Sequence, residues 1–168
     1  MNPFSSLRQQ ENLEIADNDD LVALARKIIN ERHLGVLTTV DSENAPHARW
    51  MATLTLDTFP RLLTLTAAHS AKVRHIRVNP QVDWLFANED FTVALNLRGT
   101  AQVHVDTVTI KRAWKIIEDK SHLYFLNTFD GKFALAVVET EIERIDYTAA
   151  EAGIRLSHFV MEPVPVEA

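Results

Sequence analysis

A basic segment within an acidic chain is the part of this sequence best suited to binding chemistry. The span from Thr58 to Val82 contains no Asp or Glu, although the chain as a whole carries a net charge of -6. The same span holds four cationic residues, namely Arg61, Lys72, Arg74 and Arg77. Such local segregation of charge is typical of an anion site, but it is also typical of a surface helix whose outer face is solvated. The charge pattern alone leaves both interpretations open.

The local sequence predicts a strand, a tight turn and a short helix in this segment. Residues 62–66, LLTLT, are apolar and Thr-rich, which suits a strand. Ser70 stands where an N-cap belongs, with a hydroxyl able to accept a hydrogen bond from a first-turn N–H, and Pro80 stops the helix. The free N–H groups of a helix start favour an anion such as phosphate, to which Lys72 would add a full charge. Hydroxyls from Thr66 and Ser70 would complete such a site.

The rest of the sequence predicts a mainly β chain with two further helices. Apolar residues at i, i+3, i+4 and i+7 indicate the helices, and alternating residues between polar turns indicate the strands. The expected elements are a helix that opens at residues 18–20, a hairpin of strands 36–40 and 46–56, strands 82–87 and 91–105, a helix after 106–107, a strand at 133–147, and a final strand or extended arm at 154–166. Strands joined by short turns predict an antiparallel β-barrel with flanking helices. We expect one domain over residues 1–168, with a flexible arm at 1–16.

Three residues or segments carry more specific structural expectations. Gly99 lies inside the long strand 91–105, where it is expected to form a bulge or a corner. The apolar run 133–138, FALAVV, implies burial on both faces of its strand, one against the barrel interior and the other against a helix or a second subunit. Trp114 lies in the apolar stripe of a predicted helix and is expected in the core rather than at a ligand.

Composition excludes several classes of site and partner. The chain contains no cysteine, which removes disulfides, thiolate nucleophiles and cysteine-bound metals. A pI near 5.6 argues against a general nucleic-acid binder, which needs a broad basic face. No apolar run approaches the ~18 residues of a membrane span, and the N-terminal sequence lacks the basic and apolar regions of a signal peptide. We therefore expect a cytoplasmic protein that binds neither nucleic acid nor membrane.

The familiar catalytic motifs are missing from the sequence. It contains no GxxxxGK[ST], GxGxxG, GxSxG or HExxH, so a phosphate would have to be bound by a helix start. His69 and His75 lack the i, i+4 spacing that places two imidazoles on one helical face, which argues against a metal site. His47 is expected to face water, whereas Arg49 beside Trp50 is a better candidate for a ligand contact. No residue is assigned a catalytic role.

Three segments, in this order and spacing, resemble a known family. They read LGVLTTVDSENAPHARWM, LLTLTAAHSAKVRHIRVNPQVDWLF and VALNLRGTAQV, and they lie within about residues 20–115. Their specific parts are a Pro-x-x-Arg strand at Pro46 to Arg49 and a Thr-x-x-x-Ser-x-Lys-Val-Arg turn and helix at Thr66 to Pro80. Together they are similar to the FMN-binding split barrel of the pyridoxamine 5′-phosphate oxidase-like superfamily, especially its general stress protein branch.

The resemblance implies a cofactor, its contacts and a partner. FMN would lie with its ring along the second strand, in contact with Arg49, Trp50 and Met51, and with its phosphate on residues of the basic turn, namely Thr66, Ser70 and Lys72. Members of the family are homodimers with two FMN sites in the subunit interface. Ala71 stands where the family often has an arginine.

The function implied by the resemblance is a flavin-dependent oxidoreductase that acts on an unidentified small molecule. Leu54 stands where the true oxidase has a lysine, and the spacing of Arg155 and His158 differs from that of the Arg-x-His of the oxidase, which argues against pyridoxamine 5′-phosphate oxidase activity. The alternatives are a flavin-binding or redox-sensing stress protein without turnover, a barrel that holds a deazaflavin or haem, and a cofactor-free dimer kept for protein interaction.

Overall fold

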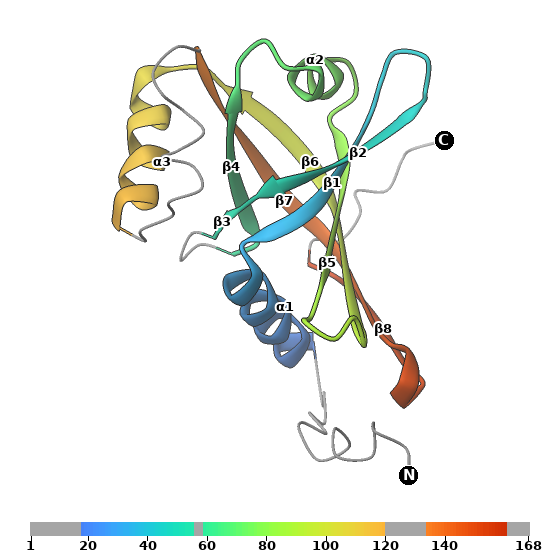
Figure 1. Cartoon of the computed structure of the whole chain (residues 1–168). Coiled ribbons are helices and arrows are strands. Elements are labelled where there is room, and N and C mark those ends of the chain that lie inside the picture. The colour runs from blue at the N-terminus through green and yellow to red at the C-terminus, as the bar shows by residue number, and fades with distance from the viewer. Residues whose placement is uncertain (1–17, 56–58, 120–133, 161–168) are drawn as a thin grey trace.

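The computed structural model of the chain describes residues 18–55, 59–119 and 134–160 (Figure 1). The expected arm at 1–16 and the far end of the 154–166 segment lie outside these residues. The described part is mainly β, with three α-helices placed around one antiparallel sheet. Its elements in chain order are α1 (Asn18–Arg32), β1 (Leu34–Val40), β2 (Pro46–Ala52), β3 (Leu54–Thr55), β4 (Arg61–Ala67), α2 (Ala71–Val78), β5 (Gln81–Ala87), β6 (Val93–His104), α3 (Thr107–Asp119), β7 (Leu135–Ala149), η2 (Ala150–Ala152) and β8 (Ile154–Phe159).

The sheet curls into a split barrel, which confirms the expected fold class. Its strand order is β2-β1-β5-β6-β7-β4-β3, and β8 pairs with β7 outside this path. The order begins with β2 and ends with β3, yet only Thr53 separates these two strands in the sequence. The ends of the sheet are therefore held next to each other by the chain itself, although the ladder is not closed.

Thr53 also corrects one expectation from the sequence. A single strand was expected over 46–56, but the structure has two strands with different partners. β2 pairs with β1, whereas Leu54 pairs with Leu63 of β4. The Thr53 N–H donates to the carbonyl oxygen of His33 at 2.8 Å, so it bonds to the end of α1 instead of continuing a ladder. This bond ends β2. After Thr53 the chain continues as β3, at the other end of the strand order.

The barrel interior is filled by large side chains that alternate with polar outward residues. The largest fully buried side chains include Trp84 and Phe86 of β5 and Leu95 and Leu97 of β6. The Trp84 indole N–H donates to the hydroxyl of buried Thr140 at 3.2 Å, which satisfies both polar groups. The apolar face of α1 packs on the same cluster through Leu21, Leu24, Ala25, Ile28 and Ile29.

Gly99 marks an irregularity in the longest ladder, as expected. The β6–β7 register shifts between Arg98 and Gly99, where Arg98 lies opposite Arg144 and Gly99 lies opposite Ile142. The extra residue is therefore Glu143 on β7, which the sequence did not indicate. A Cβ atom built on Gly99 would overlap the carbonyl oxygen of Glu141 and lie 2.9 Å from its carbonyl carbon. Only glycine allows the two strands to approach this closely.

The first part of β7 is buried on both faces, as its apolar run predicted. Val138 faces the barrel interior, whereas Val137 packs in a separate cluster with Leu65 of β4 and Ala113 of α3. Trp114 packs against this second cluster, which confirms its place in the core. Of the two covers that the sequence left open for the outer face, α3 lies on this part of β7.

Candidate functional site

The basic turn and helix lie at one end of the barrel, at the top of Figure 1 between β4 and the β1–β2 hairpin. Buried Val73 and Ile76 fix α2 on the barrel, because they point one edge of this short helix into the core. Ser70 is at the N-cap with extended backbone angles of φ -69° and ψ 156°. The expected strand, turn and helix are therefore all present.

The Ser70 hydroxyl does not cap the helix, so that part of the expectation was wrong. It makes no hydrogen bond to a first-turn N–H. Its Oγ atom is nevertheless buried, and it has no partner within the part of the chain that the structure describes. Buried polar atoms are nearly always paired in native proteins, so this hydroxyl is available to a partner from outside the described chain, such as a water or a ligand. An oxygen of an anionic ligand would satisfy this hydroxyl.

Lys72 supplies a cation in the first turn of α2, two residues after Ser70. Its Nζ donates to the Thr66 hydroxyl at 2.9 Å, and Thr66 is almost fully buried at the end of β4. Burial lowers the pKa of Lys72, and the positive charge of nearby Arg49 lowers it further. Over residues 18–55, 59–119 and 134–160, no carboxylate pairs with Lys72. A half-buried cation of this kind would be stabilised by a bound anion.

Arg49 reaches the same region from β2. One of its terminal nitrogens, Nη1, donates to the hydroxyl of Thr39 at 2.7 Å and to the carbonyl oxygen of Leu37 at 3.3 Å. Both acceptors belong to β1, and the hairpin register places Leu37 directly opposite Arg49. Burial lowers the pKa of Arg49, whose guanidinium remains charged at any physiological pH. Two cations therefore converge on the start of α2 from separate elements.

The structure separates the three residues expected along a flavin ring. Side chains of a strand alternate between its faces, so Trp50 points away from Arg49 and Met51. Trp50 is 64% exposed, whereas Met51 packs partly against the core. Arg49, Thr66, Ser70 and Lys72 lie together, and Trp50 lies on the opposite face of β2. β2 is the first strand in the strand order, so within the described residues no strand pairs with its edge away from β1.

The other two arginines of the basic helix point away from the site. Arg74 donates from Nη1 to the carbonyl oxygen of His69 at 3.0 Å, on the exposed side of the turn. Arg77 is exposed in the last turn of α2. For Arg74 and Arg77, the structure therefore favours the solvated helix face, one of the two interpretations that the charge pattern left open.

The sequence did not indicate a group of four residues that lies next to Arg49. The Thr39 hydroxyl lies 3.0 Å from His75 Nδ1, and the rings of His75 and His47 are 4.7 Å apart. His47 Nε2 is 2.8 Å from a carboxylate oxygen of Asp41. The hairpin register, with Thr39 opposite His47, was the available signal for one half of this group. The contact of His75 depends on how α2 packs on β1, which no local pattern specifies.

The arrangement is suited to holding a phosphate and not a metal. It offers Lys72, Arg49, a buried hydroxyl and a helix start, which are standard phosphate ligands. In the described part of the chain, no three His, Asp or Glu side chains are placed to hold a metal ion. No described helix is long and apolar enough to cross a membrane. The residues present thus fit the phosphate of a nucleotide-like cofactor.

Comparison with solved structures finds the same fold in several proteins. A Listeria innocua protein assigned provisionally as a pyridoxamine 5′-phosphate oxidase is 26% identical, with a TM-score of 0.60 over 74% of this chain and 95% of its own. General Stress Protein 26 from Bacillus anthracis is 20% identical, with a TM-score of 0.61 over 81% of this chain and 97% of its own. Proteins of the expected general stress branch thus share the fold.

Two further neighbours carry other cofactor names. A heme-binding protein from Mycobacterium smegmatis is 16% identical, with a TM-score of 0.65 over 83% of this chain and 57% of its own. An F420 reductase is 17% identical, with a TM-score of 0.54 over 71% of this chain and 94% of its own. These likenesses show the fold alone. No match was found among curated proteins.

The match to a family model covers most of the chain. Residues 21–149 match the model of the pyridoxamine 5′-phosphate oxidase family, a range that runs from α1 to the end of β7 and includes the whole candidate site. The chain therefore belongs to the pyridoxamine 5′-phosphate oxidase family.

Proposed function

We propose that the protein binds FMN and acts as a flavin-dependent oxidoreductase on a small molecule. The observation that carries the proposal is the meeting of Lys72 and Arg49, which no described carboxylate neutralises, with the buried and unpartnered Ser70 hydroxyl at the start of α2. A phosphate at this position would pair with both cations and satisfy the hydroxyl. The family match supports the same ligand.

The protein residues would bind and orient the cofactor. Lys72, Ser70 and Thr66 would hold the phosphate, and Arg49 would stand between the phosphate and the ring. The edge of β2 away from β1, at Arg49 to Met51, would lie along the ring with its backbone groups available for hydrogen bonds. FMN, when bound, supplies the redox chemistry, and the protein tunes it with these hydrogen bonds and with the nearby positive charge of Arg49.

The alternative cofactors and the alternative without turnover each make a prediction that differs from that of an FMN-dependent enzyme. A haem needs an axial ligand, which His47 or His75 could supply only through the ring nitrogen that is not already bonded within the protein. A deazaflavin also presents phosphate, so it would use the same cations, and the two flavins must be compared directly. A stress protein that only stores or senses flavin would bind FMN and show no oxidation of a nicotinamide donor.

The phosphate should contribute substantially to the affinity for FMN. Charge-assisted hydrogen bonds contribute ~1.5–3 kcal/mol each, so FMN should bind at least about 30-fold more tightly than riboflavin, which lacks the phosphate. Fluorescence titration with FMN, riboflavin and a deazaflavin would measure the three affinities. Equal affinity for FMN and riboflavin would contradict the assignment of the phosphate site, and preference for the deazaflavin would replace FMN by the alternative cofactor.

We also infer that the protein is a homodimer that uses the outer face of the sheet. A row of cross-strand neighbours on this face begins with apolar Trp50, Val36 and Leu85, and it continues with polar Asn96 and Asp146. Trp50 and Leu85 are 64% and 38% exposed. An exposed apolar patch rimmed by polar residues is typical of a protein interface. A dimer on this face would bring Trp50 close to the other subunit, where the family resemblance places FMN.

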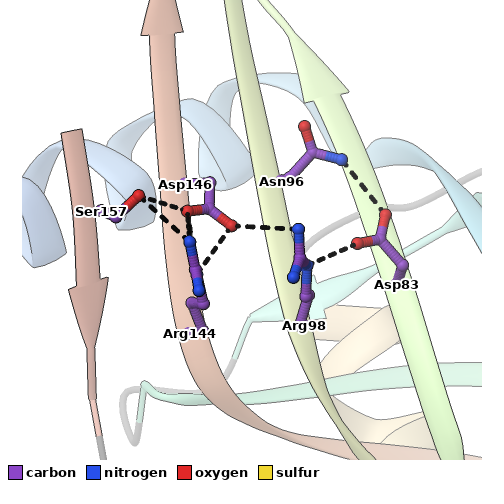
Figure 2. A network of polar contacts seen from close by, with 6 residues as sticks. All are labelled: Asp83, Asn96, Arg98, Arg144, Asp146 and Ser157. Carbon is purple, nitrogen blue, oxygen red and sulfur yellow. Dashed lines mark hydrogen bonds and ion pairs between the residues drawn. The ribbon is translucent and has the colours of Figure 1, made fainter. Parts of the chain in front are cut away.

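A network of charged and polar side chains on this face links β5, β6, β7 and β8 (Figure 2). Arg98 of β6 lies between two carboxylates, 3.7 Å from Asp83 of β5 and 3.6 Å from Asp146 of β7. Asp146 also bonds to Arg144 at 2.8 Å and to Ser157 of β8. Burial raises the pKa of Asp83, and the neighbouring Arg98 and Asn96 oppose that change. Charges of both signs lie close together here, so the face can meet a second copy of itself without net repulsion.

Leu85→Glu should convert the dimer into monomers. A two-fold interface contains each position twice, so two unpaired carboxylates would be buried, at a cost of several kcal/mol. Val108→Glu is the matched control, because Val108 is a 78% exposed apolar residue on α3, away from this face. Light scattering after size-exclusion chromatography would give the masses. A monomeric wild-type protein, or an L85E variant as dimeric as V108E, would contradict the inference.

A further inference from the structure

Five side chains form a continuous chain from solvent to the candidate site. Asp41 bonds to His47, the ring of His47 lies against that of His75, and Thr39 lies between His75 and Arg49. His47 is on the exposed side, with 45% of its side chain accessible, whereas Thr39 is fully buried. The FMN proposal uses Arg49 but leaves both histidines without a role. They are titratable groups two and three contacts away from Arg49 along this chain.

The donors and acceptors in this chain indicate the protonation state of His75. The Arg49 guanidinium can only donate, so the Thr39 oxygen accepts its hydrogen bond. The Thr39 hydroxyl hydrogen is buried and needs an acceptor, and Nδ1 of His75 lies at 3.0 Å. His75 therefore accepts at Nδ1 and carries its hydrogen on Nε2, as a neutral imidazole. A second proton, at Nδ1, would leave the Thr39 hydrogen without its acceptor.

The charges around His75 also favour its neutral form. Those that face it are Arg49 and His47 on β2, Asp41 in the β1–β2 turn, and Arg74 on α2 itself. The strands β1 and β6 also pack on α2. Their side chains that contact this helix include uncharged Thr39 and Val103. Burial lowers the pKa of His75, as do the charges of His47, Arg49 and Arg74, and only Asp41 raises it.

We propose that His75 takes up a proton when an anion binds at the start of α2, so that mild acidity strengthens anion binding. An anion there would offset the positive charge of Arg49, which opposes protonation of His75 in the free protein. The loss of the Thr39 hydrogen bond accompanies protonation both with and without the anion, so this cost cancels from the difference. The charge effect does not cancel, and it sets the sign of the coupling.

This coupling rests on the proposed function only in naming FMN as the natural anion. Binding and protonation are reciprocal, because a ligand that raises the pKa of a group binds more tightly when that group is protonated. The pKa of His75 is below its ordinary range in the free protein and would rise on binding. Additional affinity would therefore appear as the pH falls through the pKa that His75 has in the anion-bound protein. It would reach its maximum below the pKa that His75 has in the free protein.

Sulfate is the appropriate probe, because its charge does not change over the range in which histidine titrates, whereas the phosphate of FMN itself takes up a proton near pH ~6. The NMR titration of the His75 ring would be followed in the apoprotein with and without saturating sulfate. We expect its midpoint to rise by about half a unit to one unit, and sulfate to bind roughly 3- to 10-fold more tightly at about pH 5.5 than at about pH 8.

Two variants separate His75 from its neighbour. His75→Asn keeps an uncharged acceptor near the position of Nδ1, so it should retain sulfate binding at high pH and lose most of the dependence on pH. His47→Gln keeps a donor to Asp41 and should preserve the response of His75. An unchanged pH dependence in H75N, a fixed His75 midpoint under bound sulfate, or the absence of sulfate binding at both pH values would overturn the proposal.

The outcomes distinguish this proposal from that of FMN binding. If the protein binds no FMN but the titration midpoint of His75 rises with sulfate, the proton-linked anion site is supported and the FMN proposal is contradicted. A protein that binds FMN with an unmoved His75 midpoint retains the flavin site and loses the coupling.

Discussion

Lys72→Glu is expected to lower the affinity for FMN by at least about 100-fold, which corresponds to ~2.8 kcal/mol. The substitution removes the one lysine at the start of α2, which bonds to Thr66 at 2.9 Å and lies two residues after Ser70, whose hydroxyl is unpartnered in the described chain. It also places a carboxylate where the phosphate would bind, and like charges in a half-buried site repel strongly. Fluorescence titration with FMN would measure the loss.

Arg77→Glu is the matched control for this prediction. It makes the same change of charge on the same helix, at an exposed residue of the last turn. We expect less than about a threefold change in affinity, because solvent screens a surface charge at this distance. Far-UV circular dichroism would show that both variants keep the fold. Equal losses in K72E and R77E would mean that general attraction by a basic surface, and not a defined phosphate site, holds the ligand.

Gly99→Ala is expected to destabilise the protein by at least about 3 kcal/mol, at the upper end of overpacking effects. The added methyl group would overlap the carbonyl oxygen of Glu141, which is backbone and cannot rotate away. β6 and β7 would have to separate at their bulge, in the longest ladder of the barrel. Urea unfolding followed by tryptophan fluorescence would report the change through buried Trp84.

Gly153→Ala provides the comparison for this second prediction. Gly153 has a positive φ of 67° but no atom within 4 Å of an added Cβ, so only the backbone conformation opposes the substitution. The expected cost is about 1 kcal/mol. A G99A variant within about 1 kcal/mol of the wild type would show that the close approach of the two strands is easily relaxed.

The sequence predicted those features that depend on neighbouring residues. The basic helix was predicted from Ser70 and Pro80 at its ends. The hairpin followed from alternation around a polar turn, and Gly99 marked the bulge. Local steric and hydrophobic effects determine these features, so they can be inferred from a short window.

The features that the sequence did not predict depend on packing between distant elements. Thr53 ends β2 because its N–H meets the carbonyl of His33, a contact that exists only once α1 has packed on the barrel. The inserted residue is Glu143, next to the partner of Gly99 on β7 and more than forty positions away along the chain. Ser70 has the backbone of an N-cap, yet its hydroxyl does not cap the helix. No propensity or spacing rule encodes such contacts.

The residues of the candidate site also divide into those that the sequence indicated and those that only the structure reveals. The type and order of residues indicated Arg49, Thr66, Ser70 and Lys72, and the fold brings them together at one end of the barrel. Trp50 lies on the other face of its strand, where it would serve an interface between subunits. His75 could be found only from the structure, because its contact with Thr39 joins α2 to β1.

The most direct test of the account is equilibrium dialysis of the purified protein against FMN, with the visible spectrum of the retained flavin. We predict one FMN retained per chain, with a dissociation constant of roughly micromolar or below and with visible bands altered from those of free FMN. Retention of no FMN at tens of micromolar ligand, with an unaltered spectrum, would contradict the central claim that the start of α2 is a flavin phosphate site.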